Sequence, residues 1–259
     1  MRPSERRQHI LELLRQRERI SVDELARTLS ASQETIRRDL AELADSGQVT
    51  KFHGGVCLPA RGEHENAFQT RMNEFSQEKR AVARYAAGLY SAGDSILIDT
   101  GTTTLFFARE LARLNRITVI TNSLLVAESI GASGNRVFMI GGEYRPESNQ
   151  NSGPLALEQI ARFNAEHAVV TIGALSVDGA FDFSIEEAEI ARAMIARARY
   201  LTVIADSSKL GRSALFQVFP LERIDRLIID RKPIGELANA LAQANVDVHE
   251  APAAQRADW

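Results

Sequence analysis

The chain has 259 residues, long enough for a small and a medium domain, and its 44% hydrophobic and 25% charged residues are ordinary for a soluble globular protein. A net charge of −3 excludes nucleic-acid binding through overall basicity, so any DNA contact must depend on where the cations lie. The lone cysteine excludes an internal disulfide, and no Cys/His cluster has zinc-ligand spacing. Because no secretory signal or apolar run of ~20 residues is present, we expect a cytoplasmic protein without membrane contact, metal or cofactor.

The first 58 residues predict three short helices followed by a β-hairpin. Apolar residues recur on one face of the first segment, Ser21 and Glu24 form a capping box, and the small residues 30–32 predict a tight turn. The expected elements are helices over residues 4–17, from Ser21 onward and over 33–45, and strands over 49–52 and 56–58. This order is typical of a winged helix-turn-helix domain.

The third predicted helix has the pattern of a recognition helix. Ile36, Leu40 and Leu43 share one face, which would hold the helix on its domain, and Gln33 and Arg37 share another. An isolated arginine pair would more simply be a solvated helix face, but the surrounding turn and hairpin favour DNA binding. The candidate DNA-binding residues are Ser32, Gln33, Thr35, Arg37 and Arg38 on the helix and Lys51 and His53 on the wing, with added phosphate contacts from Arg6 and Arg7.

The rest of the chain alternates predicted strands and helices. This alternation favours an α/β domain with a mostly parallel sheet covered by helices on both faces. The expected strands are 95–98, 117–121, 137–140, 168–172, 201–205, 227–229 and 246–248, and the expected helices are about 77–90, 104–113, 123–131, 155–163, 185–198 and 235–244.

Polar residues follow several of these strands. Residues 99–104 (DTGTTT) place a glycine and hydroxyl side chains at a helix N-terminus, which favours an anion site, although the segment would also serve as a simple helix cap. Because ligands of open α/β sheets bind beyond the carboxyl ends of the strands, these groups predict a pocket. There Lys209, unless it is only a surface lysine, would neutralise a phosphate, and Asp99 and Asp206 would bind sugar hydroxyls. The other groups at strand ends are Thr121-Asn122, Gly141-Gly142-Glu143, Gly173 and Asp206–Lys209.

The N-terminal motif resembles the helix-turn-helix of the DeoR family of repressors. The matching positions are Arg6, Ile10, Leu14, Ser32, Thr35, Ile36, Arg37, Arg38, Asp39 and Leu40, and His53-Gly54-Gly55 resembles the wing of that family. The segments ILIDTGTTT, TVITNSLLVA, MIGGEYR, EEAEIARAMI and ADSSKLGR are similar to its C-terminal sensor domain.

The resemblance implies a sensor domain with a fold like that of ribose-phosphate isomerases and CoA-transferases, in which the DxGTT loop holds a phosphate. It therefore implies a phosphorylated sugar or polyol as effector. The effector-binding residues that it implies are Asp99, Gly101, Thr102, Thr103, Asn122, Gly141, Gly142 and Lys209. One departure is Ala191, where many members have lysine before the arginine, and it leaves the role of helix 185–198 open. The segment Phe181–Glu187 resembles the glycerol-3-phosphate regulon repressor branch of the family.

We therefore expect a transcriptional repressor of a sugar or polyol catabolic operon, with operator DNA and a phosphorylated sugar or polyol as partners and a homo-oligomer, dimer or tetramer, as the active form. The expected organisation is a DNA-binding domain over 1–58, a linker over 59–75, a sensing and oligomerising domain over 76–250 and a tail over 251–259. Two alternatives stay open. One is a sugar-phosphate isomerase with a DNA-binding appendage, and the other is a constitutive DNA-binding protein whose second domain only oligomerises.

Overall fold

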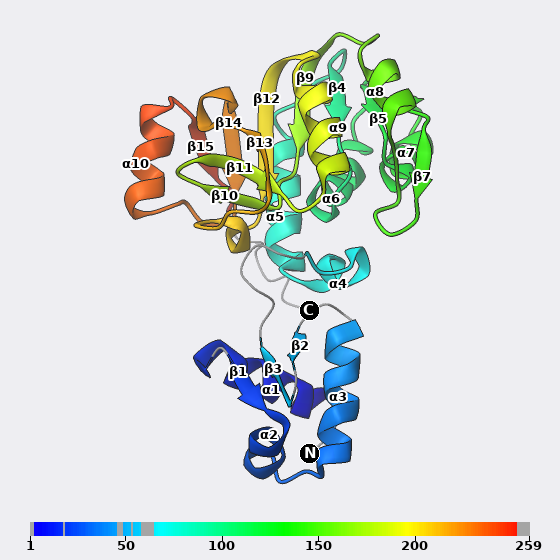
Figure 1. Cartoon of the computed structure of the whole chain (residues 1–259). Coiled ribbons are helices and arrows are strands. Elements are labelled where there is room, and N and C mark those ends of the chain that lie inside the picture. Colours follow the sequence, from blue (N-terminus) through cyan, green and yellow to red (C-terminus); the bar gives the residue numbers. More distant parts are fainter. Residues whose placement is uncertain (1–2, 18, 46–48, 53, 58–64, 253–259) are drawn as a thin grey trace, which may run out of the picture. The chain divides into compact units, whose positions relative to one another are not determined.

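The computed structural model describes residues 3–17, 19–45, 49–52, 54–57 and 65–252. Its internal contacts divide the chain into two compact units, residues 1–70 and 71–259, which are described separately. The first unit contains α1 (Pro3–Arg17), β1 (Arg19–Ser21), α2 (Val22–Thr28), α3 (Gln33–Asp45), β2 (Thr50–Phe52) and β3 (Gly55–Cys57). The predicted three helices and hairpin are confirmed (Figure 1).

The core of the first unit is formed by the apolar helix faces that the sequence predicts. Ile36, Leu40 and Leu43 of α3 are buried, and they pack with residues of α1, α2 and the wing. The side chain of Ser21 begins α2 by accepting a hydrogen bond from the Glu24 amide at 3.2 Å, as its capping box predicts. The domain thus depends on one shared apolar cluster: Ile10, Leu14, Ile20, Leu25, Ile36, Leu40, Leu43, Val49 and Val56.

The wing is joined to the helices by a third strand. The short extended step at residues 19–21 is β1, which pairs with β3 in an antiparallel sheet of order β1-β3-β2. Ile20 lies opposite Val56, and the Val22 amide at the start of α2 donates to the Gly54 carbonyl at 3.1 Å. Strand β3 with Gly54 and the start of α2 are therefore joined to each other.

A buried ion pair ties α1 to α3. Arg6 Nε lies 2.5 Å from Asp39 Oδ2, and both side chains are largely buried. Arg7 pairs with Glu42 on the same two helices, at a more exposed position. These pairs engage both arginines within the domain, and the phosphate contacts that the sequence suggested for them stay a prediction.

The second unit is built on a seven-stranded sheet of order β15-β14-β12-β9-β4-β5-β6, in which every adjacent pair is parallel. Its strands are β4 (Ser95–Ile98), β5 (Thr118–Thr121), β6 (Arg136–Met139), β9 (Ala165–Val170), β12 (Ala198–Ala205), β14 (Arg226–Ile229) and β15 (Asp247–Glu250). The associated helices are α5 (Ser76–Ala87), α6 (Thr102–Leu111), α7 (Leu124–Gly131), α8 (Pro154–Ile160), α9 (Ile185–Ile195) and α10 (Gly235–Gln243). Helix α4 (Phe68–Asn73) spans the division between the two units. The predicted parallel α/β domain is confirmed.

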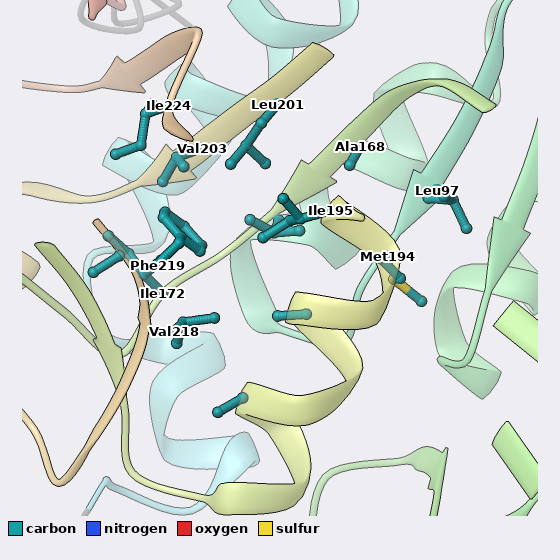
Figure 2. Packing of buried hydrophobic residues seen from close by; sticks show 14 of the residues in the cluster. Leu97, Ala168, Ile172, Met194, Ile195, Leu201, Val203, Val218, Phe219 and Ile224 are labelled. Carbon is teal, nitrogen blue, oxygen red and sulfur yellow. The ribbon is translucent and has the colours of Figure 1, made fainter. Parts of the chain in front are cut away.

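Helices cover both faces of this sheet, because its strands are apolar on both sides (Figure 1). Along β4, Leu97 faces a cluster with α8, α9 and α10, whereas Ile96 and Ile98 face a cluster with α5, α6 and α7. Figure 2 shows the first cluster, in which Met194 and Ile195 of α9 point toward the strands. Ala191 is buried there, so the position that departs from the family pattern belongs to the core.

Two antiparallel elements escaped the prediction. A second sheet contains β10 (Ala174–Ser176), β11 (Gly179–Asp182) and β13 (Phe216–Phe219), and a hairpin contains β7 (Glu143–Arg145) and β8 (Gln150–Ser152). These strands have three or four residues, too few for a periodic pattern, and β11 finds its partner β13 far along the chain. Short 3₁₀ turns, η1 (Ser207–Lys209) and η2 (Leu221–Arg223), complete the domain. Among the helices of the described chain, none combines the length and apolarity needed to cross a bilayer.

Replacing Asp39 with alanine should destabilise the winged domain by about 3 kcal/mol, because it removes the carboxylate that pairs with the largely buried Arg6 guanidinium. Glu42→Ala, which removes the partner of Arg7 at an exposed position, should change stability by at most about 1 kcal/mol. Hydrogen exchange of the α3 amides in the full-length protein measures both effects. Equal protection in the two variants would show that the buried pair does not hold the helices together.

Candidate DNA interface and effector site

The start of α3 is fixed by its own hydroxyl residues. Ser32 Oγ accepts a hydrogen bond from the Thr35 amide at 3.2 Å and lies 2.8 Å from Thr35 Oγ1. Ser32 is therefore the N-cap of the helix, which accounts for its place before an amphipathic run. Because the cap sets the position at which the helix begins, it also sets the direction in which Gln33 and Arg37 project.

Three of the predicted DNA-binding residues line one open cleft in the first unit. Gln33 and Arg37 of α3 and Lys51 of β2 surround a cleft of about 650 Å³, together with apolar and acidic residues of α2 and the wing. Arg38 is exposed on the same helix but does not line the cleft, and His53 lies outside the described residues. A cationic helix face beside a cationic wing is the arrangement with which winged domains hold a DNA backbone and read a groove.

In the second unit, the parallel sheet brings the predicted effector residues to one edge. The chain leaves β12, β9, β4, β5 and β6, five adjacent strands, at their carboxyl ends. The turns after these strands contain Lys209, Thr171, Asp99, Asn122 and Gly141, in spatial order. The edge therefore gathers the polar groups that the sequence analysis singled out at strand ends.

The turn between β4 and α6 is held by the neighbouring strand. The Asp99 carboxylate is buried and accepts the Thr171 amide at 3.0 and 3.2 Å. A Cβ atom at Gly101 would lie 2.2 Å from Thr171 Cγ2, so only glycine fits at the N-cap of α6 without displacement. Thr102 and Thr103, in the first turn of α6, are also buried.

Burial raises the pKa of the Asp99 carboxyl well above its ordinary value, and the nearby carboxylates of Asp182 and Glu187 raise it further, whereas the Thr171 amide opposes the change. Three carboxyl groups thus gather near the turn. Such groups accept hydrogen bonds from hydroxyls but repel a phosphate. A phosphorylated ligand would therefore place its hydroxyls here and its phosphate on the amides of the α6 N-terminus.

Asn122 is buried, and its side-chain oxygen accepts no hydrogen bond from the described residues. Its Nδ2 donates to Gln150 Oε1 at 2.9 Å and to the Asn151 carbonyl at 3.0 Å. Its Oδ1 is buried and has no hydrogen-bond partner among the described residues. Because an unpaired buried acceptor is costly, this atom is suited to a donor on a ligand, such as a hydroxyl.

The β7–β8 hairpin joins the turns after β4 and β5 to the start of α9. Gln150 Nε2 donates to Glu187 Oε1 at 3.1 Å and to Ser148 Oγ at 2.9 Å. Thr100 Oγ1 donates to the Ser148 carbonyl at 3.1 Å. The hairpin was missing from the prediction, yet it supplies the main connection between these parts of the edge.

Gly141 and Gly142 have packing roles in the described contacts. The Gly141 amide donates to Gln159 Oε1 on α8 at 3.0 Å. Gly142 has a φ of +148°, and a Cβ atom there would lie 2.5 Å from the Ser152 carbonyl oxygen. Gly142 therefore lets the chain pass close to β8 and the start of α8, and the contact of both glycines with an effector stays a prediction.

Asp206 is engaged inside the domain. Its Oδ1 accepts hydrogen bonds from the amide and the hydroxyl of Ser208, and its Oδ2 lies 3.8 Å from Lys79 Nζ. Only 1% of Asp206 is exposed, so the sugar-hydroxyl contact that the sequence suggested finds no support in this arrangement. Lys209 follows in the same 3₁₀ turn and is partly exposed.

Lys79 is a buried cation that the sequence analysis missed. Burial lowers its pKa, the Asp206 carboxylate opposes this change, and the Lys209 ammonium adds to it. The signal was present, because Lys79 shares the apolar face of its helix with Val82, Ala83 and Ala86. A lysine on an apolar helix face indicates either that this position is exposed or that the ammonium has a buried partner.

Both units match known families. Residues 74–231 match the DeoR C terminal sensor domain, and residues 6–61 match the DeoR-like helix-turn-helix domain. The chain belongs to the DeoR family. Both the resemblance drawn from the sequence and the DNA-binding class that it implied are confirmed.

Similar proteins extend over nearly the whole chain. The HTH-type transcriptional repressor CsqR of Escherichia coli K12 is 32% identical, over 94% of this chain and 94% of that protein. The HTH-type transcriptional repressor GlcR of Bacillus subtilis 168 is 30% identical, over 96% of each. The glycerol-3-phosphate regulon repressor of E. coli K12 is 29% identical, over 96% of this DeoR-family chain and 99% of that protein. These relatives are named repressors, which sets the isomerase alternative aside.

Solved structures show more distant likenesses. Ribose 5-phosphate isomerase A from Methanocaldococcus jannaschii covers 53% of this chain and 55% of its own, at 17% identity and a TM-score of 0.40. The Pyrococcus horikoshii translation initiation factor eIF-2B covers 88% and 82%, at 15% identity and a TM-score of 0.45. At such scores the fold assignment rests on the sheet order and on the DeoR family.

Replacing Gly101 with alanine should destabilise the sensor domain by about 1–3 kcal/mol, because the added methyl group collides with the stiff Thr171 side chain. The matched control is Gly88→Ala at the end of α5, where φ is −67° and the nearest atom would be 3.4 Å away. Urea denaturation of the full-length variants measures the difference. If the two substitutions cost the same, the turn is not packed against β9 as tightly as the structure indicates.

Proposed function

We propose that this protein represses a sugar or polyol catabolic operon and releases its operator when a phosphorylated sugar or polyol binds the sensor domain. The DeoR family and the names of the similar repressors support the class of function. The choice of effector is supported by the chemistry of the strand edge, where a helix N-terminus lies beside buried hydroxyl and carboxyl groups.

The observation that carries this proposal is the turn between β4 and α6. Gly101 leaves no room for a side chain, Asp99 is pinned by the Thr171 amide, and Asn122 on the next strand keeps a buried acceptor without a partner among the described residues. A turn that served only to cap α6 would not require this buried polar surrounding. We assign the phosphate to the α6 amides and to Lys209, and the hydroxyls to Asn122 and Asp99.

DNA binding is assigned to the exposed face of α3 and to the wing. Gln33 and Arg37 would enter the major groove, while Lys51 would contact the backbone. A single winged domain makes few contacts, so we propose that a dimer or tetramer places two such domains on paired half-sites. The sensor domain would supply the contacts between subunits. Effector binding would then favour an arrangement that no longer matches the half-site spacing.

Arg37→Ala should weaken operator binding about tenfold or more, because one well-placed arginine contact contributes about 1–3 kcal/mol. The melting temperature should change little, since Arg37 is exposed. Fluorescence anisotropy with labelled DNA from the promoter of the regulated operon measures the affinity. The matched control is Arg113→Ala, which removes an exposed arginine of the sensor domain. Unchanged affinity in Arg37→Ala would remove α3 from the interface.

A thermal-shift panel of phosphorylated sugars and polyols, including glycerol 3-phosphate, should give a saturable rise in melting temperature with one compound and none with its unphosphorylated form. Thr102→Val keeps the buried shape but loses a hydroxyl at the α6 N-terminus, so it should reduce this rise and spare operator binding. A flat panel would favour a purely oligomerising sensor domain. A full response in Thr102→Val would instead move the phosphate away from this turn.

A further inference from the structure

The connection from α4 to α5 contains an unusual backbone position. Helix α4 ends at Asn73, α5 begins at Ser76, and Phe75 between them has a φ of +50°. A bulky residue in this left-handed region costs about 1–3 kcal/mol unless the surroundings enforce it, and such positions gather at switch regions. Because the Phe75 side chain is 46% exposed, burial of its ring does not enforce the conformation.

Lys79 closes this junction from within α5. Its ammonium donates to the carbonyl of Arg71 at 2.5 Å and to the carbonyl of Glu74 at 2.8 Å. These are acceptors in the last turn of α4 and just after it, where a helix has unpaired carbonyls. Lys79 itself is only 3% exposed, so these bonds are made away from solvent. Lys79 is therefore a cap for α4, supplied by the following helix.

The same ammonium faces the turn that leaves β12. Asp206 Oδ2 lies 3.8 Å from Lys79 Nζ and has no hydrogen-bond partner among the described residues. Ser208 holds the other carboxylate oxygen, and Lys209 comes next in the chain. The ammonium thus lies between the end of α4 and the turn that contains a proposed phosphate-binding residue.

Helix α4 also has apolar contacts. Met72 packs partly against the cluster of α5, α6 and α7, and Phe68 is buried. In the sequence, α4 directly follows the segment that leads out of the winged domain. Lys79 thus binds the C-terminal end of α4, in addition to the other interactions that Arg71 and Glu74 make.

We propose that Lys79 is a positioning residue that couples the turn 206–209 to α4. Through this coupling, effector binding at the carboxyl ends of the parallel strands would affect the segment leading to the winged domain. This rests on the function proposed above for that edge. A phosphate bound beside Lys209 adds negative charge near the Lys79 ammonium, which then interacts less with the carbonyls of Arg71 and Glu74. The end of α4 is released, and the strained turn at Phe75 can relax.

Stability alone does not account for this arrangement. Replacing a buried ion pair with apolar residues of similar size is often neutral or stabilising. An apolar residue at position 79 would also extend the surface formed by Val82 and Ala86. The lysine is thus better explained by the two sets of acceptors between which it lies.

Lys79→Met in the full-length protein tests the coupling. Hydrogen exchange of residues 68–75 should rise at least about tenfold, whereas the β4 amides keep their protection. Addition of glycerol 3-phosphate, the probe used, should change the operator dissociation constant of the wild type about tenfold, within the 5–150-fold range of allosteric effects, and that of the variant less than threefold. The variant should keep the thermal shift with this compound, and Lys79→Arg should restore part of the coupling. Arg84→Ala, on the exposed face of α5, is the matched control.

Asp206→Asn is the second variant, because it weakens the ion pair and leaves Lys79 in place. It should decrease exchange in residues 68–75, because without the Asp206 charge the ammonium interacts more strongly with the carbonyls of Arg71 and Glu74, and this test requires no effector. Unchanged exchange there would overturn the coupling, as would a Lys79→Met protein that keeps the full response of operator binding to glycerol 3-phosphate. If the wild type does not respond to this compound, the proposed effector fails, and the exchange of residues 68–75 in the two variants still decides the role of Lys79.

Discussion

The parallel pairing of β4 between β9 and β5 is the constraint on which the sensor domain depends. It places Asp99 beside the Thr171 amide and forces Gly101 against the Thr171 side chain. If either neighbouring strand shifted by one residue, side chains would exchange faces and both apolar clusters would be broken. The apolar interior therefore fixes the position of the polar edge.

The two domains place their charges in opposite ways. In the winged domain, Arg6 is turned inward to Asp39, while Arg37 and Arg38 are left on the surface. In the sensor domain, the carboxyl groups of Asp99 and Asp182 are drawn into the interior near a helix N-terminus. A weakly acidic chain can thus present a cationic face to DNA, because local placement outweighs the total charge.

The sequence alone predicted the helices and strands that have long, regular apolar patterns. Helix α3 and the parallel strands follow from periodicity, and the residues at strand ends follow from the rule that parallel strands share an edge. The β7–β8 hairpin was missed because its strands are polar and short, and β13 was missed because its pairing with β11 is long-range. The inward role of Arg6 could not be predicted either, since a charged residue near an amphipathic helix face is compatible with pairing or with solvent.

The third strand of the wing bears on how the operator can be recognised. Because β1 pairs with β3 and the Val22 amide donates to the Gly54 carbonyl, strand β3 is fixed against the start of α2. The domain would then bind DNA with little change in its own shape, so the double helix would have to deform to fit it. Operators whose DNA bends easily, or whose minor groove narrows easily, at the wing contact would bind better than stiffer operators with the same bases in the major groove. Part of the specificity would then lie at base pairs that no side chain touches.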